Sequence, residues 1–253
     1  MKPTTGIRTR DPRTVDDSCR LCDIALMGRL LLGLTVTATL LIAGATDALA
    51  NSFGSNFLTG SCCTIRGIRS DIRRDTLNSP SGAFAVIRVY AQESSDNNGL
   101  IQVGYTTSSG SGDNCGNFSG VRFFYEWNVD GSTAFHCQTI SGAVSGTHRF
   151  TVARVSPSTS GQWQAFLDGT ARISPPPELL FQKAGRAGGG GEISASGSNV
   201  DGCYGCSGGT TPFQRSPDIC CTGANWITIQ NATKKEDTGW TVGNVPSPYG
   251  VIH

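Results

Sequence analysis

The sequence predicts an all-β protein, an antiparallel β-sandwich or jelly roll, on the strength of three observations. Short alternating segments recur from residue 83 onward, clusters of Gly, Ser, Asn and Pro separate them, and almost nothing after residue 51 has helical periodicity. The composition, with 38% hydrophobic residues, 15% charged residues and 33 glycines, is that of a globular chain. Many short strands between turns are typical of a sandwich.

The alternating segments give the expected elements. Strands are expected at 83–91, 99–106, 121–129, 148–155, 162–168, 170–174, 191–196 and 225–230. Asp168-Gly169 predicts a tight hairpin turn between two of them. Isoleucines at 65, 68 and 72 have a spacing that suits one short helix. Residues 175–177 are expected to form a stiff proline connector, and 188–191 a flexible glycine connector.

The first fifty residues have the pattern of a targeting segment. An apolar run from Leu30 to Ala45 follows Arg29, and small residues around Ala48 and Ala50 suit a signal-peptidase site. The run is shorter than the roughly 20 residues of a membrane-spanning helix, so cleavage after Ala50 is expected and a retained anchor is the alternative. This predicts a secreted, extracellular domain at 51–253 without stable membrane insertion after cleavage. Either Met1 or Met27 could be the true start.

The charge balance argues against nucleic acid as a partner, and the cysteine content predicts disulfide bonds. Lys and Arg number 20 against 19 for Asp and Glu, so no basic field favours nucleic acid as a partner. The exported part carries an even set of cysteines, which predicts disulfides: Cys62, Cys63, Cys115, Cys137, Cys203, Cys206, Cys220 and Cys221. The first candidate is Cys115–Cys137, which flanks the strand at 121–129. A zinc site formed by the last four cysteines is the rival interpretation, but adjacent cysteines suit a tetrahedral site poorly. We therefore expect no metal and no cofactor.

Alternation within the strands assigns side chains to faces. Phe123, Tyr125 and Trp127 share one side of their strand and are expected in the core, which leaves Glu126 on the opposite side. The same rule puts Gln102 and Glu192 opposite apolar faces of their strands. If the three strands belong to one sheet, these polar side chains could converge on its concave surface. Any half-solvated sheet shows the same pattern, so chance convergence is the alternative.

Three segments together resemble a known family. Leu100 to Tyr105, Phe124 to Trp127 and Gly191 to Ile193 are similar, in that order, to segments of the secreted glutamic peptidases, the eqolisins. The chain also resembles uncharacterised secreted bacterial proteins that end such a sheet in a hairpin like Trp163 to Gly169.

The resemblance implies a concanavalin-like jelly roll of two seven-stranded antiparallel sheets and an acid endopeptidase activity. By motif, Gln102 falls on the catalytic glutamine, Glu126 on the glutamate of the aromatic motif, and Glu192 on the catalytic glutamate. Two departures are that Phe124 stands where the family has tryptophan, and that Thr106 or Thr107 stands where it has an acidic residue.

Two functional hypotheses follow, and whether the chain is an enzyme stays open between them. The first is a non-catalytic module that binds a polysaccharide or an extracellular protein or peptide on its concave face, through Phe124, Glu126 and Asn128. Exposed aromatic rings would supply its stacking surface, namely Phe124, Phe166 and Trp226. The alternative is a glutamic-type acid endopeptidase, in which the Gln102 amide and the Glu192 carboxylate share one water about 3 Å from each.

Overall fold

The computed structural model describes eleven stretches of the chain, and every structural statement below concerns them. They are residues 51–59, 65–93, 99–107, 115–116, 118–128, 135–142, 144–154, 162–173, 184–206, 214–217 and 226–253. The predicted signal segment, residues 175–177 and four of the cysteines (Cys62, Cys63, Cys220 and Cys221) lie outside them. Among the described residues, no helix has the length and apolar character needed to cross a membrane.

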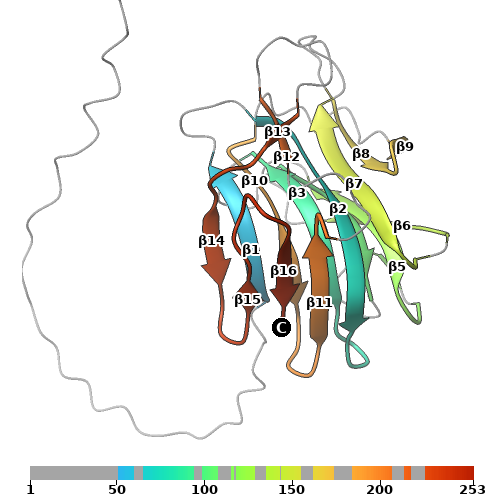
Figure 1. Ribbon diagram of the computed structural model, residues 1–253. Coiled ribbons are helices and arrows are strands. Elements are labelled where there is room, and N and C mark those ends of the chain that lie inside the picture. Colours follow the sequence, from blue (N-terminus) through green and yellow to red (C-terminus); the bar gives the residue numbers. More distant parts are fainter. Residues whose placement is uncertain are drawn as a thin grey trace, which may run out of the picture. The chain divides into compact units, whose positions relative to one another are not determined.

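The described residues form two antiparallel sheets that pack face to face, so the predicted all-β sandwich is confirmed (Figure 1). The seven-stranded sheet runs in the spatial order β14 (Thr233–Glu236), β1 (Ser52–Thr59), β10 (Arg186–Ile193), β3 (Ala85–Gln92), β4 (Leu100–Thr106), β5 (Arg122–Asn128) and β6 (His136–Ile140).

The second sheet has nine strands, seven of them in one continuous path. That path is β15 (Thr241–Val242), β16 (Tyr249–Ile252), β11 (Asn199–Tyr204), β2 (Ile65–Asn78), β7 (Thr147–Arg154), β8 (Trp163–Leu167) and β9 (Thr170–Ile173). Beside it, β12 (Gln214–Pro217) pairs with β2 and with β13 (Ile227–Thr228). The β8–β9 hairpin turns at Asp168 and Gly169, both with positive φ, as the Asp-Gly pair predicts.

The core lies between the sheets and is built by strict alternation. In β5, Phe123, Tyr125 and Trp127 all belong to the buried cluster, as predicted, and Phe150 and Trp163 meet them from the opposite sheet. Each strand of the seven-stranded sheet therefore presents its other set of side chains to the outer face.

Two predictions about local structure are wrong. The isoleucines at 65, 68 and 72 lie in the 14-residue strand β2, which is long enough for the helical spacing to arise by coincidence. The glycines at 188–191 form the middle of β10 and are buried, so they are not a flexible connector. β10 lies between β1 and β3, and both neighbouring strands pair with the glycine run along its length (Figure 1).

The structure contains two disulfides among its described cysteines. Cys115–Cys137 is the predicted pair, and it ties the chain before β5 to β6. Cys203 is bonded to Cys206, so these two sulfurs are not available as the thiolates that the rival zinc interpretation requires.

Candidate functional site

A groove of about 390 Å³ lies on the outer face of the seven-stranded sheet. Its walls come from β1, β10, β3, β4 and β5, with a few residues from the adjoining loops. It is lined by Asn51, Phe53, Ser55, Phe84, Val86, Arg88, Tyr90, Gln92, Leu100, Gln102, Thr106, Phe124, Glu126, Phe135, Arg186, Gly190, Gly191 and Glu192. All three polar residues singled out from the sequence, Gln102, Glu126 and Glu192, are therefore on one face and in one groove.

Gln102 lies at the centre of the groove, directly between two polar side chains. In the strand register it is opposite Tyr90 of β3 on one side and Glu126 of β5 on the other. Residues directly opposite each other in antiparallel strands have Cβ atoms only about 5 Å apart. The Gln102 amide and the Glu126 carboxylate can therefore reach one shared ligand or water.

The Gln102 side chain is 5% exposed, and its Oε1 atom has no hydrogen-bond partner among the described residues. Buried amide oxygens are nearly always satisfied, because leaving one without a partner costs about 1–3 kcal/mol. Gln102 is therefore a buried polar side chain in the groove lining whose hydrogen-bonding capacity the described residues do not use up.

Arg88 stands between two glycines at places where neighbouring strands approach closely. In the register, Arg88 of β3 stands between Gly190 of β10 and Gly104 of β4. A Cβ on Gly190 would lie 2.2 Å from the Gly54 carbonyl oxygen, and one on Gly104 would lie 1.9 Å from that of Ile87. No other residue fits these positions without a backbone shift, so the close approach of the strands beside Arg88 requires glycine on both sides.

The opposite side of the glycine strand is supported by tyrosines from the other sheet. Tyr204 donates its hydroxyl hydrogen toward the carbonyl oxygens of Arg88 and Gly190, each 2.9 Å away, and burial raises its pKa well above the usual value, so the donor hydrogen is retained. Tyr249 donates to the Gly189 carbonyl oxygen at 3.2 Å. The run of glycines thus has a large aromatic partner on its core side and an open groove on its outer side.

Arg88 and Glu192 form an ion pair in the wall of the groove. Their Nη2 and Oε2 atoms are 2.5 Å apart, with 14% of the Arg88 side chain and 17% of the Glu192 side chain exposed. Asn51 donates a second hydrogen bond to Glu192 at 2.7 Å. Burial alone would lower the pKa of Arg88, but the charge of Glu192, together with smaller effects of Tyr90 and Glu126, raises it above its usual value. Arg88 is therefore a permanent cation.

A second arginine lies at the β10 end of the groove. The guanidinium of Arg186 stacks on the ring of Phe57, 3.7 Å from its centre. The side chain of Arg186 is also hydrogen-bonded to Tyr90. Burial raises the pKa of the Tyr90 phenol, although the charge of Arg186 acts to lower it. The Nε atom of Arg186 is enclosed and has no acceptor among the described residues.

Glu126 lies next to the disulfide at the far edge of the groove. In the register it is opposite Cys137, and one of its carboxylate oxygens lies within 4.8 Å of the sulfurs of both Cys115 and Cys137. Since those sulfurs are bonded to each other, the three groups are not a metal-ligand set. The disulfide instead fixes the edge strand β6 against the strand that carries Glu126.

The register separates Glu192 from Gln102. Glu192 of β10 is aligned with Val86 of β3, whereas Gln102 is aligned with Tyr90, so the two residues are two strands and four positions apart. At about 4.8 Å between strands and 3.3 Å per residue, their Cα atoms are about 16 Å apart. The β10 residue in register with Gln102 is Gly188. The carboxylate adjacent to the Gln102 amide is therefore that of Glu126.

The predicted binding residues have different surroundings. Phe124 lines the groove but is 1% exposed, so the prediction that it is an exposed ring is wrong. Asn128 is also 1% exposed, and its Oδ1 accepts the backbone N–H of Leu100 at 2.7 Å. Sequence reasoning missed Arg88, Tyr90 and Arg186. The first two had a signal, because they alternate with the apolar residues of the strand predicted at 83–91.

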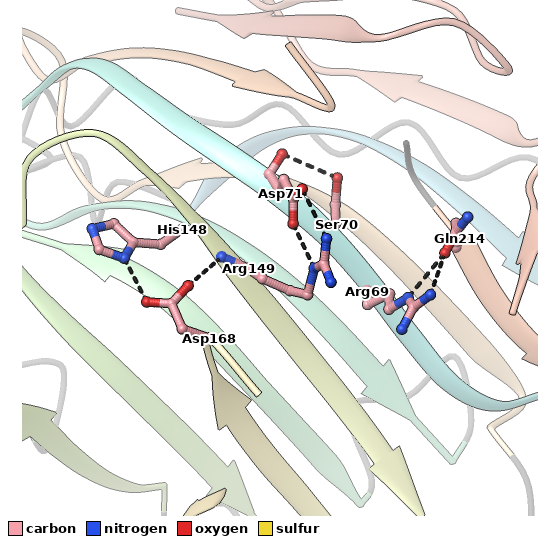
Figure 2. Close-up of polar contacts among 7 residues, drawn as sticks. All are labelled: Arg69, Ser70, Asp71, His148, Arg149, Asp168 and Gln214. Atoms are coloured by element: carbon pink, nitrogen blue, oxygen red, sulfur yellow. Dashed lines mark hydrogen bonds and ion pairs between the residues drawn. The ribbon is translucent and has the colours of Figure 1, made fainter. Parts of the chain in front are cut away.

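A second polar cluster lies on the outer face of the nine-stranded sheet. Arg149 is paired with Asp71 at 2.8 Å, and Arg69 donates to the Gln214 side-chain oxygen at 2.8 and 2.9 Å (Figure 2). Burial, followed by the charge of Arg149, lowers the pKa of Arg69 to about 10. Because Arg149 pairs with Asp71 and Arg69 is held by the Gln214 amide, the partners of these groups lie within the cluster, and we interpret it as a structural network.

The two remaining aromatic candidates are on this second sheet. Phe166 belongs to β8, and Trp226 lies under the guanidinium of Arg69 at 4.3 Å. Both rings are half-buried. They do not line the groove, so the prediction that they share one stacking surface with Phe124 is wrong.

Of the comparisons with known proteins, only the one with solved structures gives matches, and these have a similar β-sandwich fold. No protein-family model matches this sequence, and no curated protein matches it. A solved structure of scytalido-glutamic peptidase with a transition state analog inhibitor superposes with a TM-score of 0.50 at 11% identity, covering 79% of this chain and 97% of that chain. A second structure of that enzyme, with a peptide based transition state analog, has a TM-score of 0.49 at 12% identity, with the same coverage.

A third solved structure is SCP-B, a member of the Eqolisin family, in complex with the tripeptide Ala-Ile-His. It has a TM-score of 0.47 at 13% identity and also covers 79% of this chain and 97% of that chain. At 11% identity, the likeness to scytalido-glutamic peptidase with a TM-score of 0.50 shows the fold alone. The chain therefore has an eqolisin-like β-sandwich, as the resemblance of its three sequence segments implied.

Proposed function

We propose that the groove binds an extended peptide and hydrolyses it by a glutamic-type mechanism, with Gln102 and Glu126 as the amide and the carboxylate. The observation that carries this proposal is the cross-strand pair itself: Gln102 is directly opposite Glu126, both line the groove, and the Gln102 oxygen has no partner among the described residues. The structure of scytalido-glutamic peptidase that superposes with a TM-score of 0.50 holds a transition state analog inhibitor.

The chemistry assigned to each residue follows from its functional group. The Glu126 carboxylate accepts a proton from a water, and that water attacks the peptide carbonyl carbon. As the tetrahedral intermediate collapses and the C–N bond breaks, Glu126 returns this proton to the leaving amine nitrogen, which leaves the carboxylic acid and the amine as products. The Gln102 amide donates an N–H to the carbonyl oxygen as negative charge develops on it. In this scheme Glu192 does not contact the reacting atoms. It holds Arg88 in the groove wall through their ion pair.

Binding without hydrolysis is the second candidate function. It is favoured by the register, because Glu192, on which the family's catalytic glutamate falls by motif, is four positions away from Gln102, and the β10 residue in register with Gln102 is Gly188. Under this candidate the same groove would hold an extracellular protein or peptide, and Glu126 would act as a hydrogen-bond acceptor for the backbone N–H groups of that ligand.

The test is cleavage of a denatured protein by the purified chain 51–253 between pH 2 and 7, read by mass spectrometry of the products. We expect cleavage at acidic pH, a loss of about 10²–10³-fold in kcat for Gln102→Ala, and a loss of about 10²–10⁴-fold for Glu126→Gln. Gln138→Ala is the matched control, because Gln138 is an exposed residue of β6 that does not line the groove.

The other outcomes separate the two candidates. Peptide binding without cleavage at any pH supports the second candidate over the first. Cleavage that survives Glu126→Gln but is abolished by Glu192→Gln would overturn the assignment of the carboxylate. Binding of a polysaccharide in place of peptides would overturn both candidates.

A further inference from the structure

Arg186 has the surroundings of a recognition residue. Its guanidinium lies in the groove on the ring of Phe57, and its Nε has no acceptor among the described residues. None of the ion pairs between described residues includes it. Its side chain is hydrogen-bonded to the neutral Tyr90 phenol, whereas Arg88 in the same groove is already paired with an anion, Glu192.

Stacking fixes this guanidinium in a useful orientation. When one face of the planar group lies on an aromatic ring, its N–H donors project from the edge, and this edge matches the two oxygens of a carboxylate. The neighbouring group is the Tyr90 phenol, which burial keeps neutral by raising its pKa. It therefore adds a hydroxyl group without adding a competing negative charge.

The distance to the centre of the groove fits an extended peptide. Arg186 is aligned with Gln92 of β3, one same-face step from Tyr90, and so lies two strands and two positions from Gln102. The separation of their Cα atoms is about 12 Å, which an extended chain crosses in three to four residues.

We propose that Arg186 is a specificity residue that binds a carboxylate of the ligand, three to four residues from the group held at Gln102. The ligand class is an acidic peptide, and the carboxylate is either a free C-terminus or an Asp or Glu side chain. This inference rests on the proposed peptide-binding function, and it holds whether or not the bound peptide is cleaved.

The test measures binding of fluorescein-labelled nonapeptides by fluorescence polarisation to the purified chain 51–253. Three peptides are built on one sequence of Ala, Ser and Val. The first ends in a free carboxylate and the second in an amide. The third also ends in an amide but has one residue near its C-terminus replaced by Glu. Mass spectrometry confirms that each peptide stays intact. We expect at least one carboxylate-bearing peptide to bind about tenfold or more tightly than the plain amide, with a preference that falls as salt is added.

Variants of Arg186 test whether this residue causes the preference for a carboxylate. In Arg186→Gln, the carboxylate-bearing peptide and the plain amide are expected to bind with about equal affinity. Arg186→Lys is expected to keep part of the preference for the carboxylate, because an ammonium group lacks the planar edge of the guanidinium. The matched control is Arg122→Gln, since Arg122 also stacks on a phenylalanine, Phe118, at 4.7 Å but lies outside the groove.

The outcomes distinguish the two proposals. If all three peptides bind equally, or if Arg186→Gln weakens them all by the same factor, the carboxylate site is overturned while peptide binding stands. If no peptide binds, the proposed function fails and the inference fails with it. A preference for the free terminus over the internal Glu, or the reverse, identifies which carboxylate is bound. If Arg186→Gln does not fold, the proposal is still tested by Arg186→Lys and by salt: a preference that neither of them reduces overturns the carboxylate site.

Discussion

Replacing Glu192 with glutamine separates a structural role for this residue from a catalytic one. The change removes the negative charge that pairs with Arg88, while both side chains are mostly buried. Breaking one side of a buried ion pair costs about 3–5 kcal/mol, since the remaining charge is left uncompensated. We expect the low end, about 3 kcal/mol, because the new amide oxygen can still accept hydrogen bonds from Arg88 and Asn51.

This loss is large enough to measure by calorimetry. For a domain of this size, each kcal/mol shifts Tm by about 2–4 °C, so Glu192→Gln is expected to lower Tm by roughly 6–12 °C. The control is Asp75→Asn, which breaks the exposed ion pair with Arg73 and is expected to leave Tm nearly unchanged. A Tm for Glu192→Gln as high as that of the control would refute the reasoning that the pair is buried and stabilising.

A double variant completes the test. Arg88→Met with Glu192→Leu removes both charges together, so it should be more stable than Glu192→Gln alone. If the double variant is the less stable of the two, the uncompensated charge of Arg88 is not the cause of the loss.

Three further predictions concern the scaffold and the maturation of the chain. Replacing Cys115 and Cys137 with serine opens a loop of sequence separation 22 and is expected to cost about 3 kcal/mol in urea unfolding, whereas an unchanged midpoint would contradict the bond. Tyr204→Phe removes the donor to the Arg88 and Gly190 carbonyl oxygens and is expected to cost about 1–3 kcal/mol in the same unfolding measurement, whereas an unchanged midpoint would contradict this role of the hydroxyl. We also propose that the chain is exported, so mass spectrometry of the secreted protein should find Asn51 at its N-terminus. A chain that keeps residues 30–45 would instead indicate a retained anchor.

Much of the sandwich could be predicted because alternation is a local property. The strand around Tyr125 buries its aromatic residues and turns Glu126 outward, and the pattern of apolar and polar residues shows this directly. The turn at Asp168 and Gly169 follows from local chemistry in the same way. The convergence of Gln102, Glu126 and Glu192 on one face required only that their strands share a sheet, which they do.

The glycine strand could not be predicted, because its stability comes from partners distant in the sequence. Glycines at 188–191 have little intrinsic preference for a strand. Here Tyr204 and Tyr249 hold carbonyl oxygens of this strand from the core side, and β1 and β3 pair with it on both sides. Tertiary contacts thus outweigh the local propensity.

Register was the other information that a single sequence lacks. Alternation says which face a residue occupies, but it does not say where along the neighbouring strand that residue lies. Glu192 and Gln102 share a face, yet the pairing of β10 with β3 separates them by four positions. The same pairing puts Arg186 and Tyr90 together at the other end of the groove, although they are far apart in sequence.

A crystal structure of the chain 51–253 with a bound peptide tests the central claim most directly. The account predicts that the peptide lies in the groove of the seven-stranded sheet, with one of its carbonyl oxygens about 3 Å from the Gln102 amide nitrogen. The Glu126 carboxylate should contact the same peptide group, either directly or through one water. A peptide bound on the outer face of the nine-stranded sheet, or held at Glu192 without contact to Gln102, would contradict it.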